Sequence, residues 1–107
     1  MLYLVSSLPD LHPGTYQCKA VTHEQAVEYI LAANDSKSLE SYITFGSARH
    51  AIRKLCGIKV EVAQKGVVPR PADGDVFLQM RVAEKPESGR PELKDMVFFE
   101  VNYSSNL

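Results

Sequence analysis

The segment Val76-Phe77-Leu78-Gln79-Met80-Arg81-Val82 decides the fold class, because it alternates like a β-strand and is apolar enough to lie inside a sheet. Strand side chains point to alternate faces, so those at the even positions share one face, and Gln79 and Arg81 share the other with Phe77. A polar pair in a central strand needs partners, since burying polar groups without them costs free energy. The pair indicates either a ligand site or an internal network with an acidic residue such as Glu100.

Four more strands are expected around this segment. Short apolar or alternating runs bounded by turn residues predict them at residues 2–6, 15–21, 58–62 and 97–103. Turn-forming residues predict loops at residues 7–14, 63–74 and 86–90. Lys65 and Arg70, in the second of these loops, either close over a ligand or are ordinary solvated charges.

Two helices are expected between the strands. Thr22 and Gln25 have the spacing of a capping box, and the apolar residues that follow keep a helical period to about Ala33. In the second helix, Ser47 is the candidate N-cap and Gly57 supplies the stop, with one apolar stripe between them. Both helices therefore have sequence signals at their ends as well as along one face.

Strands interleaved with helices predict an α/β (α+β) fold, in which a mixed sheet of about five strands is flanked by two or three helices. The third would be a short helix at residues 91–94 with Pro91 at its first position. The length of 107 residues suits one domain, residues 1–107. So small a domain has little interior for a deep cavity, so we expect a ligand site shared between copies in a homodimer or higher oligomer.

The charge balance excludes one class of partner. The chain has 12 Lys and Arg residues against 13 Asp and Glu residues, for a net charge of -1 at pH 7. Proteins that bind long nucleic acids usually show a basic excess or a dense basic stripe. We therefore expect no long nucleic acid as a partner, whereas a small anion, which needs only two or three cations, remains a candidate.

Neither a metal nor a membrane is expected. Cys18 and Cys56 lie in a strand and at a helix end, and no Cys or His cluster has the spacing of metal ligands, so we expect no metal and no cofactor. The apolar opening of residues 1–5 is too short for a signal peptide. No other segment approaches the length of a membrane span. These features predict a cytoplasmic protein.

The start of the second helix is the candidate anion site. In Thr44-Phe45-Gly46-Ser47-Ala48-Arg49, a Gly-Ser turn opens a helix, where unpaired backbone N–H groups lie at the positive end of the helix dipole. Such helix starts attract phosphate or carboxylate groups. We expect N–H groups from Gly46, Ser47 and Ala48 to act with the charge of Arg49. The alternative is that Ser47 only caps the helix and Arg49 is a solvated charge.

His50 is the candidate acid or base. His12 lies in a loop and His23 in the first turn of a helix, so only His50 is near the proposed anion site. The alternative is an exposed helical histidine without a catalytic role. The chain has no Ser/His/Asp order, nucleophile elbow, phosphate-binding loop or dinucleotide-binding glycine pattern.

Several short motifs resemble those of a known family in order and spacing. They are Leu55-Cys56-Gly57 at the end of an amphipathic helix, Gln79-Met80-Arg81-Val82 in a strand, Val97-Phe98-Phe99-Glu100-Val101 near the terminus, and Tyr3-Leu4 in the first strand. With these motifs the chain resembles the viral ring nucleases, which are anti-CRISPR proteins, over almost its whole length.

The resemblance implies a homodimer that binds a cyclic oligoadenylate, a defence messenger, in a cleft across the two-fold axis without a metal. Family members cleave the ring with its own 2′-hydroxyl, while one histidine per subunit protonates the leaving 5′-oxygen. Arg81 stands where the family has its strand arginine, and Ser47 matches its serine at the helix start. Phe45 replaces the catalytic histidine, and Ser6 stands where an asparagine is usual.

Three functions are open at this point. The first is a viral anti-defence protein of the host-cell cytoplasm that sequesters a cyclic nucleotide messenger uncleaved, which Phe45 favours because losing a general acid lowers the rate about 10²- to 10⁴-fold. The second is a metal-independent ring nuclease with His50 as general acid. The third is a protein-binding inhibitor that reuses the fold. The expected ligand-binding residues are Ser6, Gly46, Ser47, Ala48, Arg49, Gln79 and Arg81.

Overall fold

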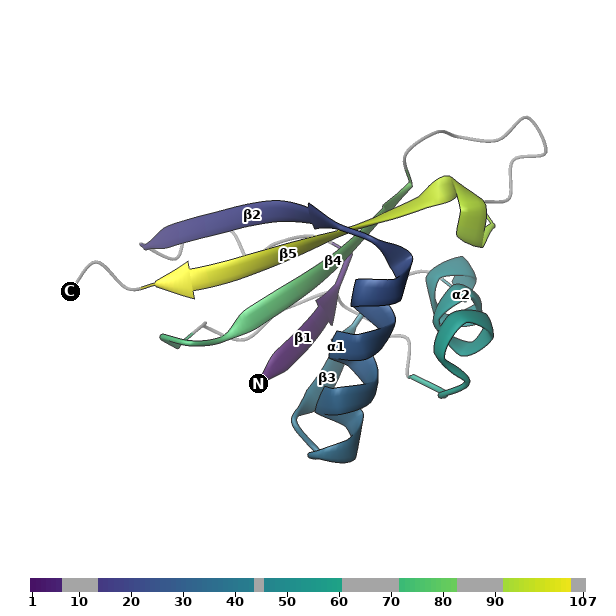
Figure 1. Ribbon diagram of the computed structural model, residues 1–107, viewed down its shortest axis with the longest axis horizontal. Coiled ribbons are helices and arrows are strands. Elements are labelled where there is room, and N and C mark those ends of the chain that lie inside the picture. The colour runs from purple at the N-terminus through teal and green to yellow at the C-terminus, as the bar shows by residue number, and fades with distance from the viewer. Residues whose placement is uncertain (7–13, 44–45, 61–71, 83–91, 105–107) are drawn as a thin grey trace.

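The computed structural model describes residues 1–6, 14–43, 46–60, 72–82 and 92–104, and shows one five-stranded mixed sheet with two α-helices and a short 3₁₀-helix (Figure 1). The elements follow the chain in the order β1 (Leu2–Val5), β2 (Thr15–Val21), α1 (His23–Asp35), β3 (Leu39–Tyr42), α2 (Gly46–Cys56), β4 (Val76–Val82), η1 (Leu93–Asp95) and β5 (Met96–Ser104). The expected fold class is confirmed.

The five strands lie in the order β2-β5-β4-β1-β3. β1 pairs in parallel with both β3 and β4, while β5 pairs antiparallel with β4 and β2. Residues 76–82 are thus an interior strand, as their apolar character predicts. Because β1, β3 and β4 are parallel, their carboxyl ends meet at one edge of the sheet.

Both helices pack on one face of the sheet. The main core lies between them and that face, with fully buried side chains from each layer: Leu4, Ile30, Ile52, Leu78 and Phe98. A second cluster lies on the other face and contains Tyr3, Val5, Phe77, Val101 and Tyr103. Leu78 and Phe77 therefore pack on opposite faces, which confirms the alternation expected of β4.

Helix α1 begins where its sequence predicts. Thr22 is the N-cap, its hydroxyl accepts a hydrogen bond from the Gln25 N–H at 3.1 Å, and the Gln25 side chain accepts one from the Thr22 N–H at 3.0 Å. Two otherwise unpaired N–H groups are satisfied in this reciprocal way. The helix continues to Asp35, slightly beyond the expected end near Ala33.

The fifth strand is not the expected one. Leu39–Tyr42, which is not among the expected strands, forms the edge strand β3. The described part of the expected strand at 58–62, residues 58–60, does not pair. An edge strand with half-exposed side chains needs no apolar alternation, so its sequence gives a weak signal. Ile58 and Val60 instead pack on the core without entering the sheet.

The short helix is η1, at Leu93–Asp95 instead of residues 91–94, and Pro91 lies outside the described residues. The expected loop residues 7–13, 63–71 and 86–90 also lie outside them, including Lys65 and Arg70.

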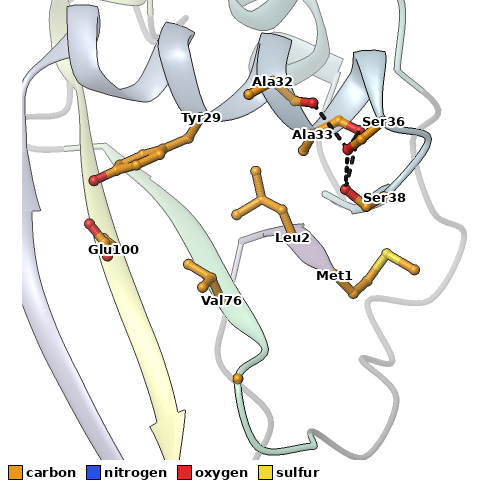
Figure 2. Close-up of a pocket in the computed structure, with 10 residues that line it drawn as sticks. Met1, Leu2, Tyr29, Ala32, Ala33, Ser36, Ser38, Val76 and Glu100 are labelled. Carbon is orange, nitrogen blue, oxygen red and sulfur yellow. Dashed lines mark hydrogen bonds between the residues drawn. The ribbon is translucent and has the colours of Figure 1, made fainter.

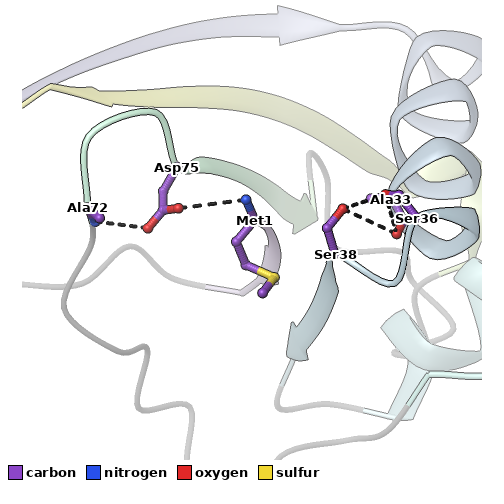
Figure 3. A network of polar contacts seen from close by, with 6 residues as sticks. All are labelled: Met1, Ala33, Ser36, Ser38, Ala72 and Asp75. Atoms are coloured by element: carbon purple, nitrogen blue, oxygen red, sulfur yellow. Dashed lines mark hydrogen bonds and ion pairs between the residues drawn. The ribbon is translucent and has the colours of Figure 1, made fainter.

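Contacts at the amino ends of the parallel strands fix their register (Figure 3). The Met1 amino group lies 3.8 Å from Asp75 Oδ1, and Asp75 Oδ2 accepts a hydrogen bond from the Ala72 N–H at 2.8 Å. The Leu2 N–H donates to the Ser38 carbonyl at 2.8 Å, and the Val76 N–H donates to the Met1 carbonyl at 3.2 Å. With their starts aligned, β1, β3 and β4 present their carboxyl ends together at the opposite edge of the sheet.

Candidate functional site

The carboxyl ends of β1, β3 and β4 form the candidate site. In sheets of parallel strands with crossover helices, ligands bind outside this edge. Helix α2 follows β3 after only three residues, so Gly46 lies within about 15 Å of Tyr42 by chain length alone. The sheet thus places Ser6 beside the end of β4, and α2 begins a short stretch of chain after the end of β3.

Ser6 and Gln79 are in direct contact at this edge. The Gln79 side-chain amide donates a hydrogen bond to the Ser6 carbonyl at 3.3 Å, across the β1–β4 pairing in which Val5 stands opposite Gln79. Both residues are half-buried. Of the sequence-predicted ligand residues, these two are joined by a hydrogen bond.

Arg81 lies two residues farther along β4, on the same face as Gln79. Its guanidinium carbon is 5.9 Å from the centre of the Phe99 ring, a cation–π distance, and the side chain is exposed. No carboxylate of the described residues forms an ion pair with it. Arg81 therefore keeps its guanidinium donors beside an aromatic surface, an arrangement that suits an anionic, ring-containing ligand.

Glu100 is not the partner of Gln79 or Arg81, so the alternative of an internal network with this residue is wrong. Glu100 stands opposite Leu78 on β4 and Lys19 on β2, so its side chain lies on the helix-covered face. Its carboxylate accepts a hydrogen bond from Asn102 at 2.9 Å and lies 3.5 Å from the Lys19 ammonium. The two polar groups of β4 face the other way, because one-residue steps along a strand alternate between faces.

The carboxylate of Glu100 belongs to a network beneath α1. Figure 2 shows the Tyr29 ring extending from the helix toward it. Burial acts to raise the pKa of Glu100, but hydrogen bonds from Asn102 and Tyr29 and the charge of Lys19 together hold that pKa below its usual value. Hydrogen bonding to Glu100 in turn raises the pKa of the Tyr29 hydroxyl. Glu100 thus pairs with Lys19 of β2 and faces Tyr29 of α1 (Figure 2).

The first turn of α2 is partly open. The helix begins at Gly46, so Ser47 lies inside its first turn and is not the N-cap that its sequence predicts. Gly46 is exposed, with nothing within 4 Å of the position that a Cβ atom would occupy. The side chain of Ala48 is fully buried, so only its backbone is left for a ligand. Phe45 lies outside the described residues.

Arg49 and His50 line a separate basic pocket on the outer surface of α2. The pocket has a volume of 200 Å³, and Arg53 and Lys59 complete its described lining. All four side chains are exposed. Two of the four were sequence-predicted. Arg53 and Lys59 were missed, although Arg53 lies one helical turn after Arg49.

The predicted residues thus fall into two groups. Gln79 and Arg81 project from the sheet face opposite the helices, whereas Arg49 and His50 lie on the outside of α2. Gly46 and Ser47 belong to the first turn of α2. One chain therefore presents two distinct cationic surfaces.

A solved viral structure is similar to this chain over nearly its whole length. It is B116 of Sulfolobus turreted icosahedral virus, with a TM-score of 0.74 and 18% sequence identity, and the match covers 94% of this chain and 97% of B116. This chain has the B116 fold. Neither a protein-family model nor a curated protein sequence matches it.

This chain also has a groove on the helix-covered face of the sheet, at the edge opposite the candidate site (Figure 2). It has a volume of 340 Å³ and lies between the end of α1 and the starts of β1 and β4, with Leu2, Ala33 and Val76 among its apolar walls. None of the sequence-predicted site residues lines it. Glu100 and Tyr29 are at one end and Ser36 and Ser38 at the other.

Among the described residues, no group of three or more His, Cys, Asp or Glu side chains is placed to hold a metal ion. Within the same residues, neither α1 nor α2 is long and apolar enough to cross a membrane.

Proposed function

We propose that this chain is a viral anti-defence protein that binds a cyclic nucleotide messenger, such as a cyclic oligoadenylate, and removes it from solution uncleaved. The observation that carries the proposal is the contact between Gln79 and Ser6 at the ends of β1 and β4, with Arg81 two residues beyond it. The B116 fold, found in a virus protein, and the resemblance of the motifs to the viral ring nucleases support the same function.

Each residue has a role in the proposed complex. Arg81 supplies a guanidinium that pairs with a phosphate, and the Phe99 ring beneath it holds the guanidinium by a cation–π contact. Gln79 and Ser6 supply polar groups at the strand ends. Backbone N–H groups of Gly46, Ser47 and Ala48 receive a second phosphate at the helix start, with Arg49 next in the chain.

A homodimer completes the proposed site. Among the described residues, Arg81 supplies the one guanidinium on the Gln79 face, whereas a cyclic oligoadenylate carries a phosphate on every nucleotide. Two copies related by a two-fold axis would double each phosphate-binding group without any new residue. The small size of the domain, which leaves little interior for a deep cavity, favours the same arrangement.

Sequestration is preferred to cleavage because of Phe45. The resemblance places a phenylalanine where the family has its catalytic histidine, and a phenyl ring cannot donate a proton. A binder inactivates one messenger per site, so the proposal requires a low dissociation constant and protein in amounts comparable to the messenger.

A depletion assay tests the proposal. Purified protein is mixed with cyclic oligoadenylates, cyclic dinucleotides and cyclic ADP-ribose isomers, and the nucleotides are analysed before and after heat release. We expect one ligand to disappear from solution and to return intact on heating. Arg81→Ala should abolish depletion, while Arg53→Ala, the same chemical change on the outside of α2, should leave it unchanged. Depletion of no ligand would favour the protein-binding alternative.

A ring nuclease with His50 as general acid is the second candidate. One observation favours it: His50 lines a pocket with Arg49, Arg53 and Lys59, and cations there could hold the phosphate that is cleaved. In this case the assay yields linear products, and His50→Ala abolishes turnover while binding persists. Turnover that survives His50→Ala excludes this mechanism.

A further inference from the structure

We propose that the basic pocket on the outer surface of α2 is a second anion site, which binds a phosphate group independently of the ligand at the strand ends. The pocket is lined by Arg49, His50, Arg53 and Lys59. It lies apart from the Gln79 and Arg81 side chains, which project from the opposite face of the sheet. Arg49 also follows the helix start of the proposed messenger site, but Arg53 and Lys59 have no part in that site, so the inference goes beyond the proposed function and does not rest on it.

The chain after α2 turns an ordinary helix surface into a concave site. Gly57 has a φ of 75°, in the left-handed region, and ends the helix. The next residues pack Ile58 and Val60 against the main core, which leaves Lys59 between them pointing outward. Lys59 therefore reaches the pocket from outside the helix, at a position fixed by its two neighbours, which pack on the core.

The pocket concentrates positive charge without internal compensation. Arg49, Arg53 and Lys59 are cations, and none of the described lining residues is acidic. In the described part of the chain, no ion pair involves any of the three. Arg49 and Arg53 are four residues apart on one helix, a spacing at which like charges repel. An anion in the pocket would replace this repulsion by attraction.

The helix dipole gives a second, independent reason to expect an anion. Helix starts are stabilised by acidic side chains and weakened by basic ones. Helix α1 follows this rule with Glu24 in its first turn, but α2 has no acidic residue in its first turn and has Arg49 and His50 in its amino-terminal half. The helix dipole favours Arg53, in the last turn of α2, but not Arg49, whose position an anion in the pocket would explain.

The volume of the pocket limits the size of the ligand that it can hold. A volume of 200 Å³ corresponds to roughly seven water molecules at about 30 Å³ each, which is smaller than the roughly 300–1,000 Å³ of pockets that enclose a drug-sized molecule. It suits one phosphate group with its hydration, not a whole nucleotide. A terminal phosphate carries about 1.5 to 2 negative charges near pH 7, which matches the three cations.

Titration of the isotope-labelled full chain with sodium phosphate tests the site, with chloride added to keep the ionic strength constant and amide signals followed by NMR. We expect saturable shifts at residues 49, 50, 53 and 59. Adenosine monophosphate should produce the same shifts and adenosine none. Comparing affinities for inorganic phosphate and for the monophosphate then distinguishes a free ion from a phosphate ester as the preferred ligand.

Paired variants separate this site from the one at the strand ends. The double variant Arg49→Gln, Arg53→Gln keeps good helix formers and should weaken phosphate binding at least tenfold, by about 1.4 kcal/mol or more. Arg81→Gln should leave it unchanged, and the amide spectrum of each variant reports whether the fold is intact. Shifts that do not saturate, or an equal loss in Arg81→Gln, would overturn the proposal.

Discussion

At the scale of the residue, Gln79 and Arg81 show which features the sequence of a single strand predicts and which it does not. The alternation of residues 76–82 places them on one face, and the structure confirms this. Their expected partner Glu100 lies on the other face. A strand sequence fixes relative faces within that strand, but the register between strands depends on pairings distant in the chain.

The same limit applies to the basic pocket. Arg49 and His50 were predicted from the helix start, and Arg53 lies one turn later on the same helix. Lys59 could be included only after the path of the chain beyond Gly57 was known. Its outward direction follows from the apolar residues on either side, but the expected strand at 58–62 would have placed it in the sheet.

Glu100→Gln should make stability less dependent on pH. The pKa of Glu100 is lowered in the folded state. The carboxylate therefore stabilises the fold fully above its unfolded-state pKa of about 4.3, and this stabilisation is lost as the pH falls through the folded-state pKa. Urea unfolding should show the variant about 1–2 kcal/mol less stable than wild type at pH 7, with a smaller gap at pH 3.

Glu92→Gln is the matched control for this change. Glu92 is 72% exposed in its pair with Lys94, and exposed pairs contribute little, so its substitution should alter stability by less than about 1 kcal/mol at either pH. A gap between wild type and Glu100→Gln that stays the same at pH 7 and pH 3 would show that the carboxylate charge is not the cause.

At the scale of the element, helices were predicted better than strands. The capping box of α1 is a local signal, made by residues three apart, and it is present as expected. β3 has no such signal, because it is held by pairing with β1, whose sequence lies more than 30 residues away. For this reason the number of strands was predicted correctly while one of their positions was not.

Thr22→Ala should destabilise the protein by about 1 kcal/mol, because it removes the hydroxyl that accepts the Gln25 N–H. Thr22→Ser keeps an acceptor at the same place and should retain most of the stability. Thermal unfolding of the three proteins measures both effects. Equal losses in the two variants would mean that the threonine methyl group, not the cap, is responsible.

Gly57→Ala should lower both the stability of the protein and its affinity for phosphate. A side chain at a φ of 75° costs about 1–2 kcal/mol, and relief of that strain would move the segment that carries Lys59. We therefore expect both lower stability and weaker binding of phosphate in the NMR titration. Full phosphate affinity in this variant would show that the position of Lys59 does not depend on the turn.

At the scale of the whole molecule, composition and pattern predicted the fold class, and the B116 fold confirms it at 18% identity. The carboxyl edge of the parallel strands was not predicted, because the parallel pairing of β1 with β3 and β4 joins segments distant in the chain. The separation of Arg49 from Arg81 could not be predicted either, because it depends on which face of the sheet the helices cover.

At this scale we predict that the protein is a homodimer in solution. Sedimentation equilibrium should give twice the 11.9 kDa of one chain, with or without ligand. Assembly through the strand ends would place two copies of Arg81 around one ligand. A mass of one chain at concentrations that saturate the ligand would remove the basis for a shared site.

The most direct test of the account is the stoichiometry of ligand removal. Increasing amounts of protein are added to a fixed amount of a cyclic oligoadenylate, and the free ligand is measured before and after heating. The account predicts depletion that ends at one ring per two chains, complete recovery of the intact ring, and no depletion by Arg81→Ala. Free ligand that stays constant at every protein concentration would contradict it.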